Sequence, residues 1–167
     1  MLSLSVIVHA AAVGVGATLA MDLWNALLRR VFGIASLNFC LLGRWVRHLE
    51  SGVVRHARIA ASPARRHECA VGWAAHYTIG VSLALGLVVA TAGDWLRTPT
   101  LAPAIVYGLL TLVFPLFVLQ PALGLGVASS ATPHPWRARL KSVASHLAFG
   151  AGLYASALAL SRTPLHG

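Results

Sequence analysis

A few polar side chains interrupt the apolar stretches of this sequence, and their types could do chemistry. They are Asp22, Asn25, His76, Tyr77, Gln120 and His146. Ionisable groups inside hydrocarbon cost free energy, and they usually face the interior of a helical bundle or a wet path through it. At about 1.5 Å per residue, Asp22 and His76 each lie about 9 Å from the cytoplasmic end of their apolar stretch, and His146 about 6 Å. The spacing therefore predicts one polar layer in the cytoplasmic half of a membrane.

Two roles fit such a layer directly. The side chains could hydrogen-bond one another and only hold the helices in register. They could instead bind a solute or relay protons, with Asp22 and the histidines as the titrating groups, which would make the chain a possible transporter. Because four helices are few for alternating access, the second role predicts a homodimer.

A bound metal or haem is another alternative. Two imidazoles and a carboxylate, from His76, His146 and Asp22, suit zinc or non-haem iron, and the two histidines alone could be axial ligands of a haem. A lipid-headgroup enzyme would use Asp22 or His76 as base and Arg44 on phosphate. The sequence contains no nucleophile triad, phosphate-binding loop or nucleotide fingerprint, so it favours a protein that is not an enzyme. Catalytic residues and cofactor stay open.

The elements that must position these residues are membrane-spanning helices. Of 167 residues, 57% are hydrophobic and 10% are charged, and the mean hydropathy is +0.75. These values lie outside the range of soluble domains. The formal net charge is +9. Since the cations flank apolar stretches, the predicted partner is anionic membrane lipid, not nucleic acid. We expect an all-α, polytopic integral membrane protein with a four-helix bundle and a single membrane domain over 1–167.

Four stretches reach the roughly 20 apolar residues that a membrane crossing needs. They cover residues 4–28, 70–92, 101–119 and 142–160. Pro115 predicts a kink or unwinding near the end of the third stretch. Eight arginines lie in the first connection and three Lys or Arg in the third, whereas the second connection and the C-terminal tail contribute only Arg97 and Arg162. The positive-inside rule therefore places both termini outside the cytoplasm.

The connections have structure of their own in this interpretation. Apolar residues recur at every fourth position between 37 and 49. This pattern predicts a short interfacial helix over 36–50, capped by Ser36 and ended by Gly52, with Trp45 at headgroup level. Residues 55–66 are basic and are expected to form a solvated loop. Residues 120–135 are rich in Gly, Ser and Pro, and they could either re-enter the membrane or form a surface loop.

The sequence holds two cysteines, Cys40 and Cys69, and both lie in the first connection. If that connection is cytoplasmic, they are expected to be reduced thiols rather than a disulfide. His67 forms an isolated His-x-Cys pair with Cys69, which is a weak metal signal because four-ligand spacing is absent.

Five strings in the sequence are distinctive. They are GATLAMDLWN (16–25), SLNFCLLGRW (36–45), GWAAHYTIG (72–80), VFPLFVLQPALGLGVASSATP (113–133) and HLAFGAGLY (146–154). With these strings the chain resembles an uncharacterised bacterial membrane family, the domain-of-unknown-function 2938 (DUF2938) family, over nearly its whole length. The resemblance implies a small four-helix inner-membrane protein, and it brings no activity, substrate or cofactor.

Overall fold

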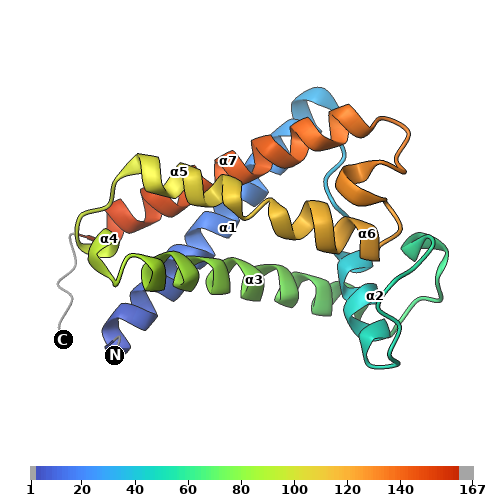
Figure 1. The fold of residues 1–167 in the computed structure, drawn as a ribbon, viewed down its shortest axis with the longest axis horizontal. Helices are drawn as coiled ribbons and strands as arrows, with labels where there is room; N and C mark the ends of the chain where they lie inside the picture. The colour runs from blue at the N-terminus through green and yellow to red at the C-terminus, as the bar shows by residue number, and fades with distance from the viewer. Residues whose placement is uncertain (1–2, 162–167) are drawn as a thin grey trace. The chain divides into compact units, whose positions relative to one another are not determined.

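The computed structural model describes residues 3–161, and these residues form helices and turns without any strand. The principal helices are α1 (Leu4–Phe32), α2 (Phe39–Leu49), α3 (Glu68–Ala90), α4 (Asp94–Arg97), α5 (Leu101–Leu110), α6 (Gln120–Ala122) and α7 (Pro135–Leu160) (Figure 1). Four helical segments are long and apolar enough to cross a membrane: Leu4–Phe32, Glu68–Ala90, Leu101–Ala122 and Pro135–Leu160. The all-α class and the four candidate spans are thus confirmed. Arg162 lies outside the described residues.

Several helices begin or end a few residues away from the predicted boundaries, each for a local reason. The first span continues to Phe32, where Gly33 ends it in a left-handed conformation (φ 65°). The fourth starts at Pro135 rather than at 142, because the fixed φ of proline suits the first position of a helix. The interfacial helix starts at Phe39, since the side chain of Asn38, not Ser36, accepts a hydrogen bond from the Cys40 amide.

The chain divides into two compact units. The first unit comprises Met1–Ala35, Tyr77–Leu110 and Ser145–Gly167, and the second comprises Ser36–His76 and Thr111–Ala144. Both α3 and α7 contribute one part to each unit. The single membrane domain therefore stays a prediction, and the two units are described separately below.

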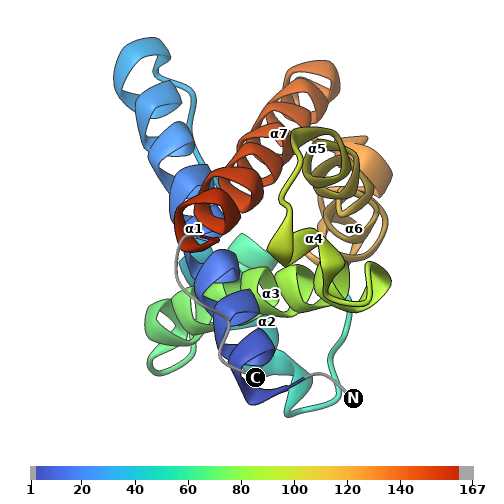
Figure 2. The same ribbon diagram turned by 90° about the vertical axis from the view of Figure 1, so that its left-hand side faces the viewer.

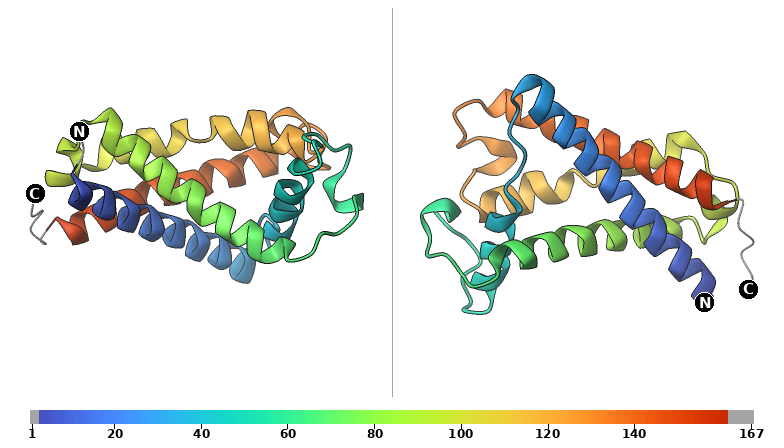
Figure 3. Two further views of the ribbon diagram at one scale, coloured as in Figure 1. Left: turned by 90° about the horizontal axis from the view of Figure 1, so that it is seen from below. Right: turned by 180° about the vertical axis from the view of Figure 1, so that it is seen from behind.

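In the first unit, small residues let the helices approach closely. A Cβ on Gly14 of α1 would lie 2.6 Å from the Val81 Cα of α3, and a Cβ on Gly152 of α7 would lie 2.8 Å from the Ala17 Cα of α1. Figures 2 and 3 show α1 crossing the C-terminal part of α7. Small residues at helix crossings are the usual means of packing in a membrane, where burial of apolar surface gives little driving force. Alanine, valine and leucine side chains from these helices form the core, together with Trp95 and Phe149.

The second unit has a smaller core of its own. Leu42, Ile59, Leu119 and Leu123 are buried, and Phe39, Trp45 and other apolar side chains pack around them. The basic stretch, residues 55–66, is mostly exposed, as its composition predicts, but it is not a plain loop, because His56 and Ile59 within it are buried. It contains a short 3₁₀ helix, Ile59–Ala61, and its His56 and Ile59 amides donate to the carbonyls of residues 122 and 123.

The third span changes its helical geometry near Pro115, where a kink or unwinding is expected. Residues Pro115–Leu119 form a π-helix, labelled η2, and the Gln120 amide donates to the Pro115 carbonyl. Because Pro115 has no backbone N–H, the regular α-helical bond to the residue four positions earlier cannot form there. The next segment is α6, followed by a short 3₁₀ turn, Val127–Ser129.

Candidate functional site

In the first unit, four of the predicted polar residues take part in contacts that join pairs of helices. The Tyr77 hydroxyl of α3 donates to Asp22 Oδ2 of α1 over 3.1 Å. The Ser145 hydroxyl of α7 donates to Asn25 Oδ1 of α1 over 2.7 Å. His146 Nδ1 of α7 lies 3.2 Å from the Gly108 carbonyl oxygen of α5. These contacts confirm that the side chains face other helices, as the small-residue spacing around them indicates.

The remaining predicted residues lie in the second unit. The His76 ring stacks on Phe39, with 4.1 Å between the ring centroids. Gln120 Oε1 accepts a hydrogen bond from the Ser129 hydroxyl over 2.9 Å, which ties the end of the third span to the loop that follows. Because the predicted residues are shared between the two units, a single layer of all of them stays a prediction.

The described residues offer little support for a metal. Within 3–161, no three His, Cys, Asp or Glu side chains form a group that could hold a metal ion. His67 Nε2 faces Arg66 Nε at 3.0 Å, and Cys69 is bonded to another cysteine. The geometry therefore does not favour the metal-binding alternative.

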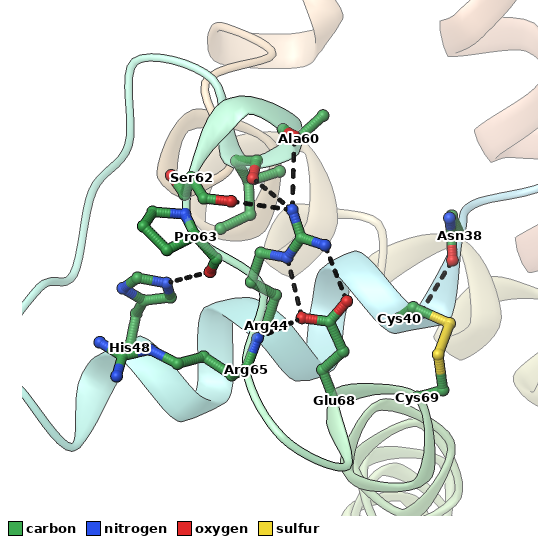
Figure 4. Close-up of polar contacts among 11 residues, drawn as sticks. Asn38, Cys40, Arg44, His48, Ala60, Ser62, Pro63, Arg65, Glu68 and Cys69 are labelled. Atoms are coloured by element: carbon green, nitrogen blue, oxygen red, sulfur yellow. Dashed lines mark hydrogen bonds and ion pairs between the residues drawn. A yellow bond between two sulfur atoms is a disulfide. The ribbon is translucent and has the colours of Figure 1, made fainter.

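The most extensive polar cluster in the second unit surrounds Arg44 on α2 (Figure 4). Its Nε donates to Glu68 Oε2 over 2.9 Å and its Nη2 donates to Glu68 Oε1 over 2.7 Å, a bidentate ion pair whose side chains are each only 14% exposed. Its Nη1 donates to the Ser62 carbonyl over 3.0 Å and to the Ala60 carbonyl over 3.3 Å. All three nitrogens of the guanidinium thus donate within the protein, and the side chain is a clamp between α2, the 3₁₀ turn and α3.

Electrostatics reinforce this clamp. The hydrogen bonds from Arg44 to Glu68 raise the pKa of the guanidinium above its ordinary value, and burial opposes them less strongly. The Glu68 carboxylate also accepts from the Arg65 amide over 2.8 Å. The sequence alone did not predict this pair, because its members lie 24 residues apart with no periodic relation.

Beside the clamp, Cys40 and Cys69 form a disulfide, which corrects the expectation of two reduced thiols (Figure 4). Two glycines explain how the cysteines meet. A Cβ on Gly43 of α2 would lie 2.5 Å from the Gly72 nitrogen, and a Cβ on Gly72 would lie 2.7 Å from the Phe39 carbonyl carbon. With no side chain at either position, α2 and the start of α3 come so close that the two cysteine Cα atoms are 3.8 Å apart.

Two buried histidines complete the cluster. His56 Nδ1 lies 3.0 Å from the Ser62 hydroxyl, and His48 Nε2 lies 3.1 Å from the Pro63 carbonyl oxygen. Their rings meet edge to face at 4.9 Å. Burial, and secondarily the charge of His48, lower the pKa of His56 below its ordinary value. His56 also lines an open pocket of about 470 Å³ together with Arg55, Ala57, Pro121, Gly124, Gly126 and Ala131.

The comparisons with known proteins add a family but no chemistry. A family model described as "Protein of unknown function (DUF2938)" matches residues 11–160. No curated protein and no solved structure matches the chain.

Proposed function

We propose that this chain, which belongs to the DUF2938 family, is a multi-pass membrane protein that moves protons or a small cation by way of Asp22. The family's description names no activity, so the proposal is argued from the chain's own residues. The observation that carries the proposal is the hydrogen bond from the Tyr77 hydroxyl to Asp22 Oδ2 between two apolar helices. We place the protein in a bacterial inner membrane, as the family resemblance implies. Both termini would lie outside the cytoplasm, since two arginines end α1 and six more lie between α1 and α3.

Asp22 suits this role because acidic residues are scarce. The sequence contains four Asp and Glu residues, and the other three, Glu50, Glu68 and Asp94, lie in connections or at the ends of helices. A carboxylate inside a span is costly, so it is usually kept for ion or proton movement. The Tyr77 hydroxyl donates to one oxygen of the Asp22 carboxyl group, and an arriving proton or cation would compete for the same oxygen.

A structural role is the second candidate, and it is favoured by the other two interhelical contacts. Asn25 with Ser145 and His146 with the Gly108 carbonyl are neutral hydrogen-bonding pairs that need no ligand to explain them. Such contacts stabilise membrane helices by about 0.6 kcal/mol on average. In this interpretation Asp22 would be one more tie between helices.

Proton flux in reconstituted vesicles distinguishes the two candidates. The purified protein is placed in vesicles that contain a pH-sensitive dye, a potassium diffusion potential is applied with valinomycin, and the internal pH is followed. We expect flux above that of empty vesicles, loss of that flux in Asp22→Asn, and a smaller loss in Tyr77→Phe. Asp94→Asn is the matched control, since Asp94 is exposed at the start of α4.

Vesicles prepared without valinomycin test sodium and potassium with cation-sensitive dyes. The transport proposal would be wrong if the folded wild-type protein moved neither protons nor these cations faster than empty vesicles. A loss of folded protein in Asp22→Asn, together with absence of flux in the wild type, would favour the structural role.

We further propose that the protein lies in anionic lipid and that two copies of it associate. Light scattering of the detergent-solubilised protein measures the mass of the assembly.

A further inference from the structure

We propose that Cys40 and Cys69 form a redox-active site that alternates between a disulfide and two thiols by exchange with cytoplasmic dithiols. This inference does not depend on the transport proposal. It concerns the second unit, whose covalent link between α2 and α3 would be opened by reduction.

The position of the pair makes it reachable. Cys69 is exposed and Cys40 is half-buried. Cys40 is the second residue of α2, and Cys69 is the second residue of α3. The first turn of a helix stabilises a thiolate because the backbone N–H groups there carry partial positive charge. Each sulfur is therefore a good leaving group when a reductant attacks the other.

The compartment argues for reversibility. Two arginines at the end of α1 and six more between α1 and α3 predict a cytoplasmic location for both cysteines. In the cytoplasm a permanent structural disulfide is unusual, and those that occur are mostly transient, catalytic or redox-sensing. A cysteine pair that is held at bonding distance in a reducing compartment fits a site that alternates between the disulfide and the dithiol form.

The exchange balances as a two-electron, two-proton reaction. A thiolate of the dithiol attacks the exposed Cys69 sulfur, the bond between the two cysteine sulfurs breaks, and Cys40 leaves as a thiolate. The second thiol of the reductant then attacks the sulfur that is bound to Cys69, which releases Cys69. The products are two protein thiols, which take up the two protons of the dithiol, and the disulfide of the oxidised reductant.

Neighbouring contacts would hold the two thiols of the reduced form close enough for reoxidation. The bidentate pair of Arg44 with Glu68 joins the same two helices without a covalent bond (Figure 4). The close approach at Gly43 and Gly72 acts between the same elements. Reduction would therefore loosen α2 without releasing it, and the two thiols would remain near each other for reoxidation.

Thiol trapping tests the proposal on the wild-type protein. Because the sequence contains only these two cysteines, a polyethylene-glycol maleimide adds twice to the reduced form and not at all to the oxidised form. The detergent-purified protein is equilibrated in buffers of reduced and oxidised dithiothreitol and is then trapped. We expect complete interconversion in both directions while the protein stays monodisperse. Cys40→Ser and Cys69→Ser calibrate a single addition.

Two further measurements separate a redox site from a passive bond. Trapping in intact cells should show a reduced fraction that falls on treatment with diamide, and a membrane-impermeant maleimide should label reduced protein only in inside-out vesicles. A pair that stays oxidised in reducing buffer while the protein remains folded would overturn the proposal. So would a pair that never oxidises in the folded protein, or labelling confined to right-side-out vesicles.

Discussion

Replacing Gly43 with alanine tests the close approach of α2 to the start of α3. Considered by its helix propensity alone, the change should stabilise α2 by up to about 1 kcal/mol. The surroundings predict the opposite sign. The new methyl group would lie 2.5 Å from the Gly72 nitrogen and 2.8 Å from the Glu68 carbonyl carbon, where an ordinary contact needs at least 3.4 Å.

The size of the effect follows from what must move. The obstructing atoms are backbone atoms of α3, the nearest being the Glu68 carbonyl oxygen, so no side chain can rotate away and α2 itself must shift. Overpacking of this kind costs about 3 kcal/mol, which leaves a net loss of roughly 2 kcal/mol after the helix propensity is included. For a chain of this length, such a loss lowers the melting temperature by about 4 to 8 °C.

The assay is thermal unfolding of the purified protein in detergent, with thiol trapping of the Cys40–Cys69 pair as a second measurement. Gly52→Ala is the control, because Gly52 has φ 74° and its added Cβ would meet nothing within 4 Å. The control should lower the melting temperature through backbone strain and leave the disulfide intact, whereas Gly43→Ala should also hinder disulfide formation. An unchanged or raised melting temperature in Gly43→Ala would refute the close helix approach.

Two other changes in the second unit have defined outcomes. Arg44→Met and Glu68→Gln should each cost about 3 kcal/mol in thermal or denaturant unfolding, because each leaves a largely buried charge without its partner. The double variant should lose less than the two single losses added together, and strict additivity would contradict a direct interaction. For pH, the lowered pKa of His56 means that the unfolded chain takes up a proton more readily than the folded one as pH falls through the ordinary value of 6.5. Stability should therefore decrease from pH 7.5 to pH 5.5, and His56→Asn should flatten that dependence; a wild type that is more stable at pH 5.5 would show that the sign is wrong.

The sequence predicted those features that repeat along the chain. Hydropathy over about 20 residues located all four spans, and the disturbance at Pro115 followed from the missing amide of proline. The sequence also indicated that Asp22 and Asn25 face other helices, because small residues share their face of α1. Their partners, Tyr77 and Ser145, could not be assigned, since rotation of one helix about its axis leaves the hydropathy pattern unchanged.

The second unit was harder to predict because its contacts are specific and distant in sequence. Arginines in the first connection were interpreted as topology signals, yet Arg44 binds the Glu68 carboxylate and donates to three carbonyl groups, because its Nη1 also reaches the Ile59 carbonyl at 3.4 Å. The disulfide was not predicted because the expected cytoplasmic location of the first connection favours reduced thiols. Gly43 and Gly72 were the available signal, since a glycine on the short helix of the connection and another near the start of the second span permit a close crossing of backbones.

The π-helix of the third span has a consequence for how this helix can vary. A π turn holds one residue more than an α turn, so each residue after Leu119 is out of phase by roughly 100° with the α-helix before it. Deleting one residue between Pro115 and Leu119 would remove this offset and turn Gln120, together with the loop that it holds through the Ser129 hydroxyl, relative to the residues just before Pro115. The extra residue thus sets the direction of the amide that anchors the following loop, which makes the length of this segment as restrictive as its composition.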